Sequence, residues 1–223
     1  YEDGYFDCAF YSLRQSIENM NNMLLSAVDA EKFEIWKEKG RFPTDKAVKD
    51  LLSRQNDAYN EIKTAIPEFF EEYNELLKKS NKYIHKQGFD TFYVNNNIPN
   101  KGNKNERTNL FLSFLKYAIG MMLIMNIALD PLSLALSDFE VDSHIPFDPM
   151  TEPIPINIFE KYLSLDIIEK IKTTEHYTTI KEYFLGMEKL NDATYAVLRY
   201  NHYDVEQLDE IEKQINQLDL SQI

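Results

Sequence analysis

The stretch LFLSFLKYAIGMMLIMNIAL, residues 110–129, is twenty residues long and carries Lys116 as its only charged side chain. A run of this length and composition is typical either of a membrane-spanning helix or of the buried central helix of a soluble bundle. Asn126 inside the run, Lys116 near its middle and the lack of a flanking basic cluster favour the second interpretation. The sequence therefore predicts a soluble helical bundle around this segment, with no membrane partner.

Helical periodicity extends on both sides of this central segment. Apolar side chains recur every three to four residues, which is the spacing of an amphipathic helix. No segment alternates apolar and polar residues over the length needed for a sheet. The predicted fold is all-α, an up-and-down bundle with a helical C-terminal extension. The flanking helices are predicted over 3–28, 45–66, 67–88, 158–171, 179–200 and 205–218.

Two breaks in this pattern suggest the domain organisation. Asp130 precedes Pro131, and the residue before a proline avoids helical geometry, so the central helix is predicted to end there. Residues 138–156 combine several prolines with acidic side chains, which is typical of a linker. We expect a bundle over residues 1–137, a proline-rich acidic linker over 138–156, and helices over 157–223 that pack on the bundle or on a partner.

Composition excludes several classes of function. The six glycines are not spaced for a glycine-rich phosphate loop, which excludes the common nucleotide-binding motifs. The single cysteine, Cys8, excludes a disulfide framework and a C-x-x-C zinc site, and it is typical of the reducing cytoplasm. A formal charge of −13 repels nucleic acid unless the basic residues gather in one place. The sequence thus predicts a cytoplasmic protein and indicates no cofactor.

An acidic cluster opens the predicted linker. It consists of Asp138, Glu140, Asp142 and His144. In an extended chain these four side chains would share one side, and oxygen ligands suit magnesium, manganese or calcium. The spacing matches no EF-hand, and a solvated acidic linker is the interpretation that we prefer. We therefore assign no metal ligand, while a site for a hard metal ion stays open as an alternative.

The candidate site is a basic segment in the helix predicted over 67–88. Asn81 and His85 lie about 40° apart on one helix face. An imidazole is a common general base, an asparagine can orient it or a phosphodiester oxygen, and lysines attract phosphate as point charges. Alternatively, the lysines only complement the negative C-terminus of the helix. The lysines of this basic patch are Lys78, Lys79, Lys82 and Lys86.

The segment Ser80-Asn81-Lys82-Tyr83-Ile84-His85 resembles the R-N-x-x-x-H motif of the HEPN superfamily (higher eukaryotes and prokaryotes nucleotide-binding). Ser80 stands where the motif has its arginine. The opening helix and the apolar helix after the histidine also look similar, so the resemblance covers about residues 3–137. It implies metal-independent RNA cleavage at a homodimer interface, with His85 as acid or base and Asn81 as a positioning group. It further implies a toxin–antitoxin or phage-defence system, with an antitoxin or defence component as partner protein.

The guanidinium that the motif lacks could come from another helix. Arg14 lies on a polar stripe of the opening helix and could supply it if that stripe faces His85. Alternatively, Arg14 only pairs with Glu18, four residues later on the same helix. We predict that Arg14 and the four lysines bind RNA. The rival hypothesis is a catalytically inactive helical module that binds another protein.

Overall fold

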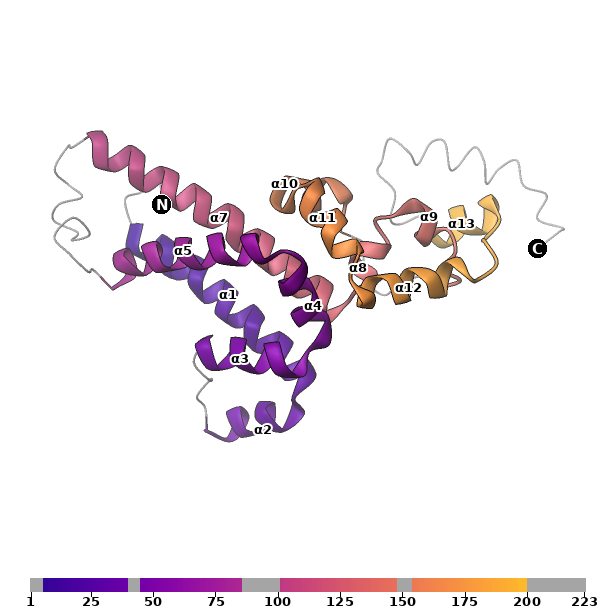
Figure 1. The fold of residues 1–223 in the computed structure, drawn as a ribbon, viewed down its shortest axis with the longest axis horizontal. Coiled ribbons are helices and arrows are strands. Elements are labelled where there is room, and N and C mark those ends of the chain that lie inside the picture. The colour runs from indigo at the N-terminus through magenta and orange to yellow at the C-terminus, as the bar shows by residue number, and fades with distance from the viewer. Residues whose placement is uncertain (1–5, 40–44, 86–100, 148–153, 200–223) are drawn as a thin grey trace.

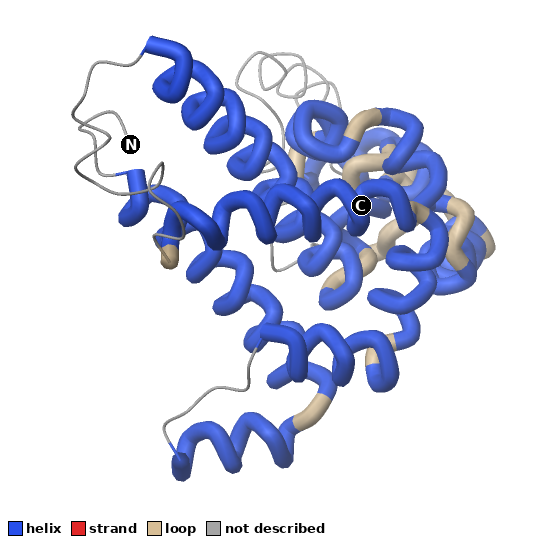
Figure 2. The backbone as a smooth tube through the Cα atoms, turned by 60° about the vertical axis from the view of Figure 1, so that its left-hand side comes forward, coloured by secondary structure: helices blue, strands red, loops and turns tan. Residues whose placement is uncertain are grey.

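A computed structural model describes residues 6–39, 45–85, 101–147 and 154–199, and every regular element in these ranges is helical (Figure 1 and Figure 2). The predicted all-α fold is therefore confirmed for the described part of the chain. The first helices are α1 (Phe6–Val28), α2 (Ala30–Lys39), α3 (Asp45–Gln55), α4 (Asp57–Ala65) and α5 (Pro67–Ile84). The later helices are α7 (Lys101–Leu129), α8 (Leu132–Ala135), α9 (Phe139–Asp142), α10 (Ile156–Leu163), α11 (Leu165–Lys172), α12 (Glu175–Leu185) and α13 (Asp192–Arg199).

Helix α7 is the central element of the fold. It contacts α1, α5, α4 and α10, and Figure 1 shows it running alongside α5 and α1. Phe114, Ala118 and Ile124 are fully buried on it. Within the described ranges, the stretch Asn105–Leu129 is the one helix long and apolar enough to cross a membrane, a test that the core helix of a soluble protein also passes.

Helices α1 and α5 lie side by side against α7. Each turns one apolar stripe inward, because its buried side chains recur at helical spacing. The buried residues of the two stripes include Phe10, Ile17 and Leu24 on α1 and Phe70, Tyr73 and Leu76 on α5. Pro67 occupies the first turn of α5, as the sequence predicts, since a proline there gives up only an amide that has no helical partner.

The prediction of one continuous helix over 45–66 is wrong, because the structure has two helices there, α3 and α4. Asn56 leaves helical geometry at φ −120° and ψ 103°, and its side-chain oxygen accepts a hydrogen bond from the Tyr59 amide at 2.7 Å. A side chain that satisfies an open amide at a helix start stabilises that start. The apolar periodicity runs through this break, which is why the sequence pattern does not reveal it.

The helix predicted over 158–171 is also two helices, α10 and α11. Ser164 separates them with φ 66° and ψ 156°, a backbone conformation that favours glycine. Its side chain makes no capping hydrogen bond to α11. The two helices therefore meet at a strained residue rather than at a conventional turn.

Replacing Ser164 by glycine is expected to stabilise the protein by about 1 kcal/mol. Strain at such a residue costs on the order of 1–3 kcal/mol, and the entropy cost of glycine offsets part of the relief. Urea unfolding measures the change. Ser113→Gly, at an exposed position inside α7, is the matched control and should destabilise by about 0.5 kcal/mol, the difference in helix propensity between serine and glycine. A Ser164→Gly protein less stable than the wild type contradicts the argument from strain.

Other predicted helix ends shift in the structure. The stretch 179–200 contains the second half of α12 and then α13, with non-helical residues between them, so it is not one helix. Helix α7 begins at Lys101, nine residues before the apolar run that opens at Leu110. It ends at Leu129, which confirms the break predicted at Asp130 and Pro131. The helix predicted over 205–218 lies outside the described residues.

The described part of the segment predicted as a linker is folded onto the rest of the molecule. Val141 and Ile145 are fully buried, and residues 139–142 form α9 rather than an extended chain. Beyond this segment, α10 contacts α7, while α12 contacts α4, α8 and α9. One hydrophobic core therefore includes buried residues from Phe10 in α1 to Phe184 in α12.

Candidate functional site

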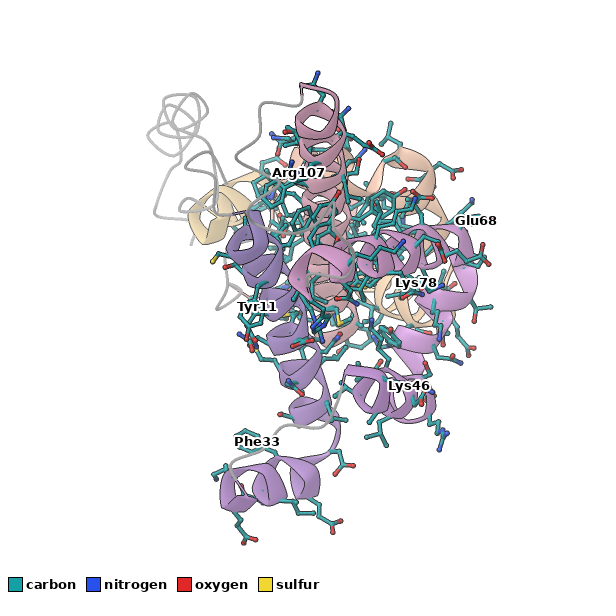
Figure 3. The ribbon with its side chains drawn as sticks, turned by 90° about the vertical axis from the view of Figure 1, so that its left-hand side faces the viewer. Tyr11, Phe33, Lys46, Glu68, Lys78 and Arg107 are labelled. Carbon is teal, nitrogen blue, oxygen red and sulfur yellow. The ribbon has the colours of Figure 1, made fainter. Side chains whose placement is uncertain are left out.

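Arg14 of α1 reaches across to the end of α5. Its Nη1 atom lies 3.2 Å from Asn81 Oδ1 and 3.2 Å from His85 Nε2. Figure 3 looks at this end of the bundle, where α1, which carries Tyr11, lies beside α5, which carries Lys78. The structure thus brings together three of the predicted site residues from two helices that are far apart in sequence.

Arg14 also makes the local contact that the sequence offered as the alternative. Its Nε atom donates to Glu18 Oε1 at 2.6 Å, and the side chains of Arg14 and Glu18 are 28% and 25% exposed. Partial burial lowers the local dielectric, so this ion pair is stronger than a fully solvated one. The two interpretations of Arg14 are therefore compatible: Nε pairs within α1 while Nη1 contacts α5.

An aromatic cluster packs α1 against α5 next to Arg14 and His85. The ring of Phe10, which is fully buried, stacks on Tyr83 with centroids 5.1 Å apart and meets Phe111 of α7 edge-on at 5.3 Å. Phe10 lies one turn before Arg14, and Tyr83 lies between Asn81 and His85 in sequence. Packing of these rings fixes the register in which α1 and α5 present their polar side chains.

His85 terminates α5 and is exposed. Its backbone amide donates to the Asn81 carbonyl at 2.9 Å, which closes the last turn of the helix. The end of the helix therefore places the imidazole one turn beyond Asn81, at the edge of the bundle and open to solvent. A ring in this place can receive a ligand from outside without any opening of the core.

Ser80 does not belong to the site. It is fully buried, and its hydroxyl has no hydrogen-bond partner among the described residues. An arginine at this position would carry its charge into the core, at a large desolvation cost. The guanidinium beside His85 comes instead from Arg14 on a neighbouring helix.

The lysines of the basic patch are less concentrated than the sequence suggests. The described ones, Lys78, Lys79 and Lys82, are all exposed, and Lys86 lies outside the described residues. At about 100° per residue, Lys78 lies about 60° from Asn81 around α5, whereas Lys79 lies about 160° away, on the opposite side. Lys79 therefore lies on a different side of α5 from Asn81, and its predicted contact with RNA stays a prediction.

Lys78 is engaged by a carboxylate. Its Nζ donates to Glu75 Oε1 at 2.6 Å. This hydrogen bond, together with the charge of Lys78, lowers the pKa of the Glu75 carboxyl below its usual value. A phosphate that approaches Lys78 has to compete with this carboxylate, so the attraction is weaker than a free lysine would exert.

The acidic cluster holds the C-terminal helices together. Asp138 accepts a hydrogen bond from the Glu140 amide at 3.2 Å. The Nζ atom of Lys181 on α12 forms ion pairs with both carboxylates, at 3.7 Å from Asp138 Oδ2 and 3.9 Å from Glu140 Oε2. Asp142 is buried and accepts a short hydrogen bond from the Tyr195 hydroxyl. The Nδ1 atom of His144 lies 2.7 Å from the Glu140 backbone carbonyl oxygen. No group of side chains suited to hold a metal ion occurs among the described residues.

Sequence reasoning missed one charge near this end of the bundle. Arg107 is buried on α7, one turn before the Phe111 ring that packs on Phe10. The only sequence signal was a basic residue just ahead of the apolar run. Glu18 was visible through its spacing to Arg14, although the sequence did not indicate that this pair would lie beside α5.

The fold and the site define an all-α protein with a guanidinium–imidazole pair at one end of its bundle. The chain matches no known family model, and no curated protein or solved structure is significantly similar to it.

Proposed function

We propose that this chain is an RNA-acting module of the HEPN kind and cleaves single-stranded RNA at the site formed by Arg14, Asn81 and His85. The observation that carries the proposal is the contact of Arg14 Nη1 with both Asn81 Oδ1 and His85 Nε2 at 3.2 Å. It supplies an arginine beside the histidine, which the motif at Ser80 lacks. A guanidinium matches the geometry of a phosphate group better than a lysine does.

Each residue has a distinct role in the proposed reaction. His85 Nε2 takes the proton of a ribose 2′-hydroxyl, and the resulting oxygen attacks the adjacent phosphorus. The P–O5′ bond breaks, the 5′ oxygen takes a proton from water, and the products are a 2′,3′-cyclic phosphate and a 5′-hydroxyl. Arg14 stabilises the charge that develops on the phosphate, and Asn81 orients Arg14. The reaction needs a 2′-hydroxyl, so the substrate is RNA rather than DNA.

The proposal also covers the setting of the activity. The resemblance supports a homodimer, a cytoplasmic location and a role in a toxin–antitoxin or phage-defence system, with an antitoxin or defence component as the partner protein. The formal charge of −13 repels RNA from most of the surface. Binding therefore depends on the local positive charges of Arg14, Lys78 and Lys82.

The test is an incubation of the protein with labelled single-stranded RNA at low salt and in the presence of a chelator. We expect binding and products that end in a 2′,3′-cyclic phosphate, while DNA of the same sequence is left intact. A protein that neither binds nor cleaves RNA under these conditions refutes the proposed function.

Removing two lysines near the site is expected to weaken RNA binding. Each phosphate contact of a single strand contributes about 0.7 to the slope of log affinity against log salt, so Lys78→Gln with Lys82→Gln should lower that slope by at most about 1.4. Lys78 should account for the smaller share, because Glu75 competes for it. Fluorescence anisotropy at several salt concentrations measures it. The control is Lys46→Gln with Arg54→Gln on α3, which removes the same charge from exposed positions elsewhere. Equal losses from both double variants contradict a localised RNA surface.

One observation favours the rival function, a module that binds another protein. On the C-terminal helices, Phe139 and Tyr183 are 66% and 64% exposed. Exposed aromatic side chains are enriched at protein interfaces. If the RNA assay fails, a Phe139→Ser, Tyr183→Ser variant that no longer co-purifies with the product of a neighbouring gene would support this alternative.

A further inference from the structure

The contact between Arg14 and His85 specifies which ring nitrogen of His85 carries a proton. A guanidinium has five N–H donors and no acceptor, so in this hydrogen bond His85 Nε2 accepts. A ring nitrogen that accepts a hydrogen bond carries no proton. The imidazole in this arrangement is therefore neutral, with its proton on Nδ1. The lone pair that a general base would use is occupied by Arg14.

Of the three side-chain contacts that Arg14 makes with Glu18, Asn81 and His85, the one with Glu18 is the shortest. The Nε to Oε1 distance to Glu18 is 2.6 Å, whereas both contacts of Nη1 to α5 are 3.2 Å. The short bond joins two opposite charges, and such bonds are about twice as strong as neutral ones. Glu18 thus fixes one edge of the guanidinium plane, and this orientation directs Nη1 at Asn81 and His85.

We infer that Glu18 is a positioning residue that makes Arg14 mask the base in the resting protein. A phosphate oxygen is charged and is a better acceptor for a guanidinium than a neutral ring nitrogen. A bound phosphodiester therefore takes over Nη1 of Arg14 and releases the lone pair of His85 Nε2. The role of RNA in this release rests on the proposed function, but the masking is a property of the free protein.

The masking can be tested without any enzymatic assay. Protein labelled with ¹⁵N-histidine is studied by NMR above about pH 8, where an ordinary imidazole is neutral. The His85 signals are identified by their loss in His85→Gln. A neutral histidine free in water carries its proton mainly on Nε2, so the expected protonation of Nδ1 is a distinctive result. Protonation of Nε2 in the wild-type protein overturns the inference.

Variants of Glu18 test its positioning role. Glu18→Ala should shift His85 towards the Nε2-protonated form, and Glu18→Gln, which keeps an acceptor for Arg14 Nε, should lie between it and the wild type. The control is Asp166→Ala, which removes an ion pair to Lys170 of the same i,i+4 spacing on α11. A role limited to the stability of α1 would not move the proton on the His85 ring. If both Glu18 variants keep the wild-type form while folded, Glu18 has no positioning role.

The ligand-driven release is tested with inorganic phosphate as the probe. Its addition to the wild-type protein should shift His85 from the Nδ1-protonated to the Nε2-protonated form, and Arg14→Ala should show the second form before any phosphate is added. If phosphate leaves the wild-type ring unchanged, the release mechanism is wrong. Failure of the RNA assay with these shifts present would instead refute the proposed function and leave the masking intact.

Discussion

Replacing His85 by alanine is expected to lower the rate of the proposed RNA cleavage by about 100-fold or more, since a positioned general base contributes about 10²–10⁴. The imidazole is exposed, and the bond that closes the last turn of α5 uses the backbone amide of residue 85 rather than its ring. The variant should therefore keep the helix content of the wild type and lose at most the small stability of one exposed hydrogen bond from Arg14 to the ring. Single-turnover cleavage of labelled RNA and far-UV circular dichroism measure the two quantities.

The matched control for this prediction is His176→Ala. His176 also uses its backbone amide, which donates to Glu61 Oε2 at 2.8 Å, so its ring can be removed without loss of that bond. We expect the control to cleave at the wild-type rate. A His85→Ala protein that cleaves as fast as this control would exclude His85 as the base and favour the protein-binding module.

Replacing Gly120 by valine is expected to lower the free energy of unfolding by about 2–3 kcal/mol, because excess volume in a close-packed core is strongly destabilising. A Cβ atom at Gly120 would lie 2.9 Å from Phe69 Cζ and 3.1 Å from the Tyr162 carbonyl oxygen. The carbonyl belongs to the backbone of α10 and cannot move aside alone. Valine therefore forces α5 or α10 away from α7, and urea denaturation followed by circular dichroism measures the loss.

Gly186 offers the comparison for this substitution. It is exposed at the end of α12 with φ −75°, and an added Cβ would come no closer than 3.3 Å to another atom. Gly186→Val should cost less than about 1 kcal/mol, as most exposed substitutions do. Equal stability of Gly120→Val and the wild type would mean that the helices around Gly120 separate at little cost.

The helical class and the break at Pro131 could be predicted because they depend on local rules. Hydropathy periodicity reports whether a helix has a buried face, and proline restricts its own neighbours in any context. The breaks at Asn56 and Ser164 could not, since the apolar spacing continues through both. Asn56 interrupts the helix through a side-chain hydrogen bond to the start of α4. Ser164 interrupts it through a positive φ, a conformation that a serine in the sequence does not predict.

The candidate site was predictable only in its separate parts. The spacing of Asn81 and His85 on one face follows from helix geometry, and so does the pairing of Arg14 with Glu18. Which helix α1 would face depends on the packing of Phe10 with Tyr83, and packing between distant segments has no local signature. The sequence placed the lysines in one patch because it counted neighbours along the chain rather than positions around the helix.

Helices from both halves of the chain pack on α7, so a shortened chain would leave part of α7 uncovered. The N-terminal helices cover one side of α7, and α10 covers another at Gly120. Cutting the chain at residue 137 would remove α10, and the apolar side of α7 beneath it would then face water. An exposed apolar surface of this kind favours self-association. The helices that carry Arg14, Asn81 and His85 share one hydrophobic core with α10 to α12, so their stability depends in part on the C-terminal helices.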